Sequence, residues 1–87
     1  MNNLSKYVIY YLENCSFSKK ALELLIKYKL PHFIIYVSQE NKNYYKNKLN
    51  KQTFPQIYYN NCNNNNNNIT YEIGGCDNLE QLFKKVG

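Results

Sequence analysis

The spacing of apolar residues along the chain predicts an alternation of strands and helices. Short runs rich in β-branched and aromatic residues predict four strands, at residues 6–10, 32–37, 57–59 and 69–73. Apolar residues at helical spacing predict three helices, which run from the turn at Cys15 to Tyr28, from about Gln39 to Leu49 and from Asn78 to Val86. The order β-α-β-α-β-β-α predicts an α/β fold with a four-stranded mixed sheet flanked by helices.

Residues with strong local preferences set the expected ends of these helices. Leu30-Pro31 is expected to end the first helix, because the residue before a proline avoids the helical conformation. Ser38 is expected to cap the second helix, whose few apolar positions should leave it half exposed. Asp77 is expected to cap the third helix, and Glu80 three residues later completes a capping box.

The second and third strands carry further signals. Residues 32–37 form a near-continuous apolar run, which is typical of a strand in a sheet covered on both faces. Pro55 is expected at the entrance of the third strand, because a proline cannot lie inside a central strand. Residues 60–68 are almost all asparagine, and we predict that they form a solvated hairpin loop in which Cys62 is an incidental exposed thiol. The 87 residues are expected to form one domain, over residues 1–87.

The first candidate for chemistry is Cys15, which follows an apolar strand and precedes an amphipathic helix. Near the start of a helix, a cysteine faces unpaired backbone N–H groups and the positive end of the helix dipole. Both favour the thiolate, which is the nucleophilic form of the side chain. From its position alone, Cys15 can equally be read as a small buried hydrophobic residue.

Composition excludes several classes of function. The formal net charge is +5, but every basic residue is a lysine and these are scattered, so we expect no nucleic-acid partner. Three cysteines without a Cys-x-x-Cys pair, together with the single His32, argue against both a disulfide scaffold and a zinc site. No apolar run is long enough to span a membrane, and the first residues lack a secretory-signal pattern. We therefore expect a cytoplasmic protein.

Three segments together resemble the glutaredoxin family, whose members have the thioredoxin fold. They are Cys15-Ser16-Phe17-Ser18, Thr53-Phe54-Pro55-Gln56-Ile57-Tyr58 and Ile73-Gly74-Gly75-Cys76-Asp77-Asn78-Leu79. These match the active-site turn, the Thr-x-Pro strand entrance and the Gly-Gly-Cys-Asp helix start of that family. Their order and spacing agree over almost the whole chain apart from the asparagine tract.

The resemblance implies a glutathione-dependent activity with Cys15 as the catalytic nucleophile. It implies a cis peptide bond between Phe54 and Pro55, which leaves the Phe54 backbone free to pair with an extended glutathione. The N–H groups of Cys76 and Asp77 would hold the glutamyl carboxylate, as helix N-termini hold anions, and the Asp77 side chain would meet the glutamyl ammonium. The implied glutathione-binding residues are Phe17, Thr53, Phe54, Pro55, Gly75, Cys76 and Asp77.

The sequence also departs from the family pattern. Ser18 replaces the second active-site cysteine, so what remains is a monothiol cycle. Leu12 and Gln52 stand where family members usually carry basic residues that contact glutathione or favour the thiolate. Lys19 and Lys51 are candidates to supply this positive charge, although each also fits the description of a solvated surface lysine.

Three functional hypotheses follow from these residues. The first, which we favour, is a monomeric monothiol oxidoreductase that acts on glutathionylated proteins or small disulfides. The second is a dimeric carrier of a [2Fe–2S] cluster, ligated by Cys15 and glutathione from each subunit. Ser16 and the short link from Leu49 to Thr53 resemble the catalytic branch of the family more than the cluster-carrying branch. The third is a thioredoxin-fold protein used only for protein contacts.

Overall fold

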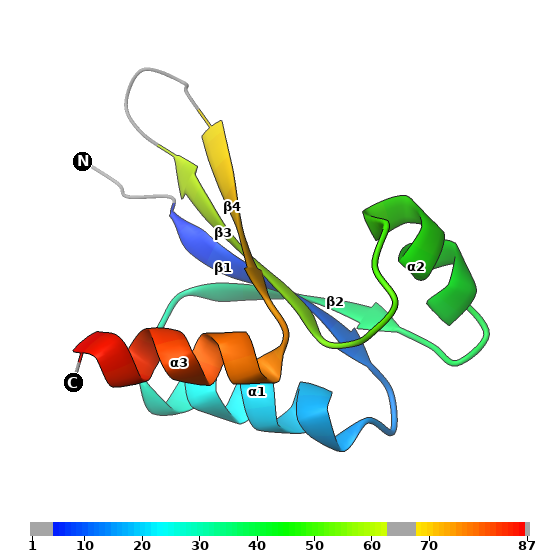
Figure 1. Cartoon of the computed structure of the whole chain (residues 1–87), viewed down its shortest axis with the longest axis horizontal. Coiled ribbons are helices and arrows are strands. Elements are labelled where there is room, and N and C mark those ends of the chain that lie inside the picture. The colour runs from blue at the N-terminus through cyan, green and yellow to red at the C-terminus, as the bar shows by residue number, and fades with distance from the viewer. Residues whose placement is uncertain (1–4, 63–67, 87) are drawn as a thin grey trace.

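Four strands and three helices follow one another in the predicted order (Figure 1). The computed structural model describes residues 5–62 and 68–86. The elements are β1 (Lys6–Leu12), α1 (Ser16–Lys27), β2 (His32–Val37), α2 (Lys42–Leu49), β3 (Gln56–Cys62), β4 (Asn68–Gly74) and α3 (Cys76–Val86). Within the described residues, no helix is long and apolar enough to cross a membrane.

The strands form one mixed sheet with the order β2-β1-β3-β4. β1 and β2 are parallel, because α1 carries the chain back across the sheet between them. β3 is antiparallel to β1, and β4 returns antiparallel to β3 as a hairpin. The predicted four-stranded mixed sheet is therefore confirmed.

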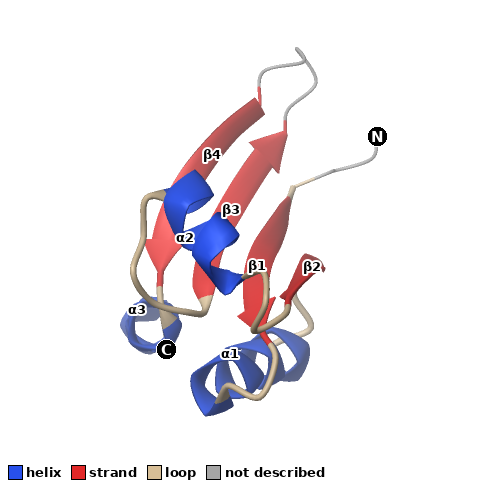
Figure 2. Ribbon diagram, turned by 90° about the vertical axis from the view of Figure 1, so that its right-hand side faces the viewer, coloured by secondary structure: helices blue, strands red, loops and turns tan. Residues whose placement is uncertain are grey.

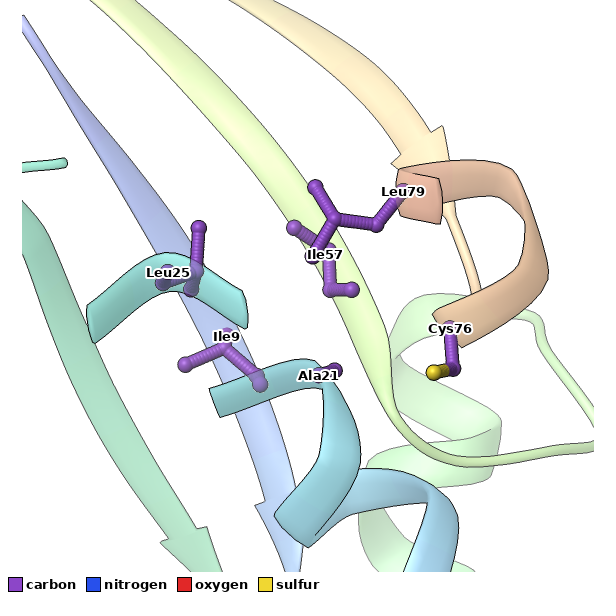
Figure 3. Close-up of a cluster of buried hydrophobic side chains, with 6 residues drawn as sticks. All are labelled: Ile9, Ala21, Leu25, Ile57, Cys76 and Leu79. Carbon is purple, nitrogen blue, oxygen red and sulfur yellow. The ribbon is translucent and has the colours of Figure 1, made fainter. Parts of the chain in front are cut away.

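The helices lie on both faces of this sheet. α1 and α3 pack against each other and against one face, where Ile9 of β1 and Ile57 of β3 meet Ala21 and Leu25 of α1 (Figure 3). Side chains alternate along a strand, so Tyr10 points to the opposite face. There its ring packs on that of Tyr45 in α2, with 5.8 Å between the ring centroids. α2 itself carries no buried residue, as its half-exposed pattern predicts, and it stands apart from the other two helices (Figures 1 and 2).

The expectation that β2 is covered on both faces is wrong. β2 lies at the edge of the sheet, and the exposed fractions of Phe33 and Tyr36, on its two faces, are 55% and 69%. Val37 alone in this strand is buried. An apolar run of six residues thus fits an edge strand as well as a central one, because the run itself does not encode which neighbours pair with it.

The first helix ends before the expected Leu30-Pro31 position. α1 stops at Lys27, and Lys29 adopts a left-handed conformation with φ of 54°. The N–H groups of Lys29 and Leu30 then donate to the carbonyls of Ile26 and Leu25, at 3.0 Å each. This Schellman-type closure satisfies carbonyls at the helix end before the proline is reached. Tyr28 lies outside the helix and packs on the Phe83 ring, with 4.6 Å between the ring centroids.

The predicted caps of the other two helices also need correction. Ser38 does not cap α2, since its hydroxyl and its carbonyl accept the Asn41 N–H in a turn that precedes the helix. Asp77 is not the cap of α3, because the helix already begins at Cys76. The side chain that closes this helix start is Asn78, whose Oδ1 accepts the Gly75 N–H at 3.1 Å.

The asparagine tract is partly strand. β3 continues to Cys62 and β4 begins at Asn68, so the loop between them is shorter than the predicted residues 60–68. Backbone pairing of Asn60 with Thr70 and of Asn61 with Ile69 extends the hairpin, since a ladder uses main-chain groups whatever the side chains are. The predicted exposure of the Cys62 thiol and the packing of Val86 concern side chains outside the described residues.

Candidate functional site

Cys15 is the residue that leads from β1 into α1. Asn14 before it turns the chain with φ of 58°, and Cys15 is the N-cap of α1 in an extended conformation, with φ of −117° and ψ of 116°. Its carbonyl accepts the first helical hydrogen bond, from the Lys19 N–H at 3.1 Å. The half-buried thiol therefore stands at the positive end of a twelve-residue helix, as the sequence predicts.

Hydrogen bonds on two sides hold the turn that carries Cys15. Ser18 is fully buried, and its hydroxyl accepts the N–H of Leu12 at 3.1 Å. On the outer side, the Glu13 carboxylate accepts the N–H of Gln39 at 2.8 Å, and the Gln39 side-chain amide donates to the Glu13 carbonyl at 2.9 Å. Ser18 therefore anchors the turn from within. The sequence marks it only as the residue replacing a cysteine.

The Thr53-Phe54-Pro55 segment reaches the cysteine from the other half of the chain. The peptide bond between Phe54 and Pro55 is cis, as the family resemblance implies. The Cys15 thiol donates to the Phe54 carbonyl, with 3.9 Å between Sγ and the oxygen. The main chain of Phe54 is thereby placed directly beside the Cys15 sulfur.

These segments and the start of α3 enclose a cavity of about 230 Å³. All seven residues that the resemblance marks for glutathione line it together with Asn78, so the lining comprises Phe17, Thr53, Phe54, Pro55, Gly75, Cys76, Asp77 and Asn78. Three short segments, far apart in the sequence, are thus brought to one place. Asn78 is the addition that sequence reasoning missed.

The two glycines before α3 have different roles. Gly74 has φ of 115°, and a Cβ there would lie 2.7 Å from Asn78 Oδ1, so a side chain would disturb the Asn78 cap. At Gly75, a Cβ would be 3.7 Å from the Pro55 carbonyl oxygen, which is an ordinary contact. Of these two glycines, only Gly74 therefore has a backbone conformation and surroundings that a side chain would disturb.

Two lysines near the ends of the site segments are paired with carboxylates. Lys51, one of the two candidate cations, pairs with Glu72 of β4, and the hydrogen bond to this carboxylate raises the pKa of Lys51. Lys20 is similarly paired with Glu80, at 3.2 Å. The first turns of α1 and α3, which carry unpaired N–H groups, both contribute residues to the cavity lining, Phe17 from α1 and Cys76, Asp77 and Asn78 from α3. Lys51 is thus bound to a carboxylate, whereas Lys19 stays exposed on α1.

Cys76 is placed for packing. It is only 4% exposed and belongs to the core cluster, where it lies beside Ala21 of α1 (Figure 3). Burial raises the pKa of the Cys76 thiol, and the nearby Glu80 carboxylate raises it further. A neutral, enclosed thiol is a poor nucleophile. Cys76 is therefore suited to offer its backbone N–H to a ligand, which is the role the resemblance gives it.

The contrast between the two described cysteines can be measured by alkylation. At neutral pH, iodoacetamide is expected to modify Cys76 at least about tenfold more slowly than Cys15, because Cys76 is buried and held in its neutral form. Mass spectrometry of peptides from timed samples gives both rates. Alkylation in urea serves as the control, where the two rates should become similar. Equal rates in the folded protein would contradict the enclosed position of Cys76.

The order of elements, with a cysteine at the first helix and a cis-proline beside it, defines a thioredoxin-like α/β fold. The family model described as Glutaredoxin matches residues 7–62, which is more than half of the 87-residue chain. The protein therefore belongs to the glutaredoxin family, the members of which are thiol–disulfide oxidoreductases of the thioredoxin superfamily and generally use glutathione as a co-substrate.

Other comparisons add little. A search of curated proteins gives no match. Among solved structures, the chain is similar to thioredoxin-2, described as a component of the protein secretion machinery of the malaria parasite. The two chains share 16% identity, with 98% of this chain and 85% of that chain covered and a TM-score of 0.49. That likeness is too distant to bear on function.

Proposed function

We propose that this protein is a monothiol, glutathione-dependent oxidoreductase that removes glutathione from proteins or small disulfides. The observation that carries the proposal is the contact of the Cys15 sulfur with the carbonyl of Phe54, a residue that lines one cavity together with the first turn of α3. We take residues 1–87 to act as one domain. We place the cycle in the cytoplasm, where a glutathione pool keeps thiols reduced.

The cavity suits the glutathionyl part of a mixed disulfide. The sulfur of the glutathionyl group would lie at Cys15, and the backbone of the glutathionyl group would pair with the main chain of Phe54, which lines the cavity. The glutamyl carboxylate would accept the N–H groups of Cys76 and Asp77 in the first turn of α3, where the helix dipole favours an anion. The exposed Asp77 carboxylate would meet the glutamyl ammonium.

The reaction proceeds by two thiol–disulfide exchanges. The Cys15 thiolate attacks the glutathionyl sulfur of the substrate, so the target thiolate leaves and takes up a proton, while Cys15 becomes a mixed disulfide with glutathione. The thiolate of a second glutathione then attacks the glutathionyl sulfur of this mixed disulfide. Oxidised glutathione leaves and the Cys15 thiolate is restored, so the net reaction converts the mixed disulfide and one free glutathione into the target thiol and oxidised glutathione.

Two features favour a single-thiol cycle over an internal disulfide. Position 18 carries a hydroxyl, which forms no disulfide and is already used as the acceptor for the Leu12 N–H. Cys76 is buried and its pKa is raised, which disfavours the thiolate needed to attack a Cys15 mixed disulfide.

The direct test couples glutathione-dependent reduction of a small glutathionyl disulfide to glutathione reductase, and looks for the adduct by mass spectrometry. We expect turnover with purified protein, and a single glutathione on Cys15 when the second glutathione is withheld. An absence of both turnover and adduct would reject the proposal. A coloured dimer, formed on anaerobic reconstitution with iron, sulfide and glutathione and lost in Cys15→Ser, would then favour the cluster carrier.

A further inference from the structure

A buried glutamine stands directly behind the Thr53-Phe54-Pro55 turn. Gln56, the first residue of β3, is only 4% exposed and pairs in register with Tyr10 of β1. Burying a polar amide is unfavourable unless its groups are hydrogen-bonded, so a buried glutamine in a small protein calls for a specific role. The proposed chemistry uses no group of this side chain.

The Gln56 amide reaches back across Pro55 to the residue that begins the turn. Its Nε2 donates to the Thr53 carbonyl oxygen at 2.9 Å and lies 3.2 Å from the Thr53 hydroxyl. The Thr53 side chain is exposed, so packing alone does not hold it. Pro55 has no N–H, so the segment has one main-chain hydrogen-bond donor fewer than a segment without proline. Gln56 provides an anchor for this turn.

This anchor lies one residue away from the atom that contacts the reactive sulfur. The Phe54 carbonyl accepts the Cys15 thiol at 3.9 Å, and Thr53, Phe54 and Pro55 all line the cavity. After Gln56, Ile57 is fully buried in the core, so the far end of the turn is fixed by packing. The backbone of Phe54 is therefore held between Ile57 on one side and the Gln56–Thr53 hydrogen bonds on the other.

We propose that Gln56 is a positioning residue that sets the place of the Phe54 backbone against Cys15 and so fixes the cavity wall on which substrate binds. The expected effect of Gln56 on catalytic turnover rests on the proposed function. The expected effect of Gln56 on the Thr53-Phe54-Pro55 segment does not. A purely structural Gln56 would change the free energy of unfolding and leave substrate binding by the folded protein unaltered.

The test uses Gln56→Met, which keeps the length of the side chain and removes its donor. We expect KM for a glutathionyl disulfide to rise about fivefold, since a net hydrogen bond is worth about 1 kcal/mol, while kcat stays within about twofold. Gln81→Met, an exposed glutamine of α3 outside the cavity, is the matched control and should leave KM unchanged.

A second measurement needs no glutathione. In Gln56→Met, the ¹⁵N order parameter of Phe54 is expected to fall from about 0.85 toward about 0.6, as the turn loses its anchor. Should Gln56→Met not fold, Thr53→Val removes only the hydroxyl acceptor and should show the same changes in weaker form. An unchanged order parameter and an unchanged KM would overturn the role of Gln56. If the wild-type protein shows no turnover, the proposed function fails, and the order parameter still decides the role of Gln56.

Discussion

A Cys15→Ser variant is expected to lose glutathione-dependent turnover by at least about a thousandfold, because a serine hydroxyl stays protonated and forms no disulfide. Both described cysteines stand at helix starts, but Cys15 is the one that is only half-buried and whose thiol contacts the Phe54 carbonyl beside the cavity. The coupled assay with a small glutathionyl disulfide measures the loss. The fold should survive, since the Cys15 side chain makes no capping hydrogen bond to α1.

Cys76→Ser and Cys62→Ser are the matched controls for that experiment. Both should keep most of the turnover, because Cys76 is buried with a raised pKa and Cys62 lies beyond the segments that form the cavity. Loss of turnover in Cys76→Ser, with the free energy of unfolding preserved, would instead show that the single-thiol scheme is wrong. Turnover that persists in Cys15→Ser would contradict the assignment of the nucleophile.

The second large effect concerns stability. Leu25→Ala is expected to lower the free energy of unfolding by about 3 kcal/mol, because the side chain is fully buried between α1 and the sheet and its removal leaves a cavity. This is a substantial part of the roughly 5–15 kcal/mol that stabilises an average small protein. Urea unfolding followed by circular dichroism measures the change.

Ile26→Ala is the control for the core prediction. Ile26 is the next residue of the same helix, loses a side chain of the same size and is 57% exposed. Its substitution should change the free energy of unfolding by less than about 0.5 kcal/mol. Equal effects at the two positions would mean that α1 presents a different face to the sheet from the one seen here.

The sequence alone predicted the parts of the site that depend on local chemistry. A cysteine between an apolar strand and an amphipathic helix, a proline at the entrance of a strand and glycines before a helix each restrict the backbone within a few residues. The order of strands and helices was predictable for the same reason. The cis bond before Pro55 was predicted from the family resemblance.

Some features were not predictable, because the local sequence allows more than one arrangement of similar stability. Asp77 and Asn78 both carry a side chain that can cap a helix, and only the position of Gly75 shows that Asn78 does so. Lys29 ended α1 by adopting a left-handed conformation to which lysine has no particular preference. The asparagines that entered β3 did so because a neighbouring strand was available to pair with them.

Contacts between distant segments were decided only by the tertiary structure. Nothing near Lys51 in the sequence indicates Glu72 as its partner, and nothing near Ser18 or Gln56 indicates that each anchors a turn beside the cavity. The sequence by itself therefore determined the order of the elements and predicted which residues on them are candidates for the chemistry. The tertiary structure decided how firmly these residues are held and which charges are neutralised, because burial and long-range hydrogen bonds arise only when the elements pack together.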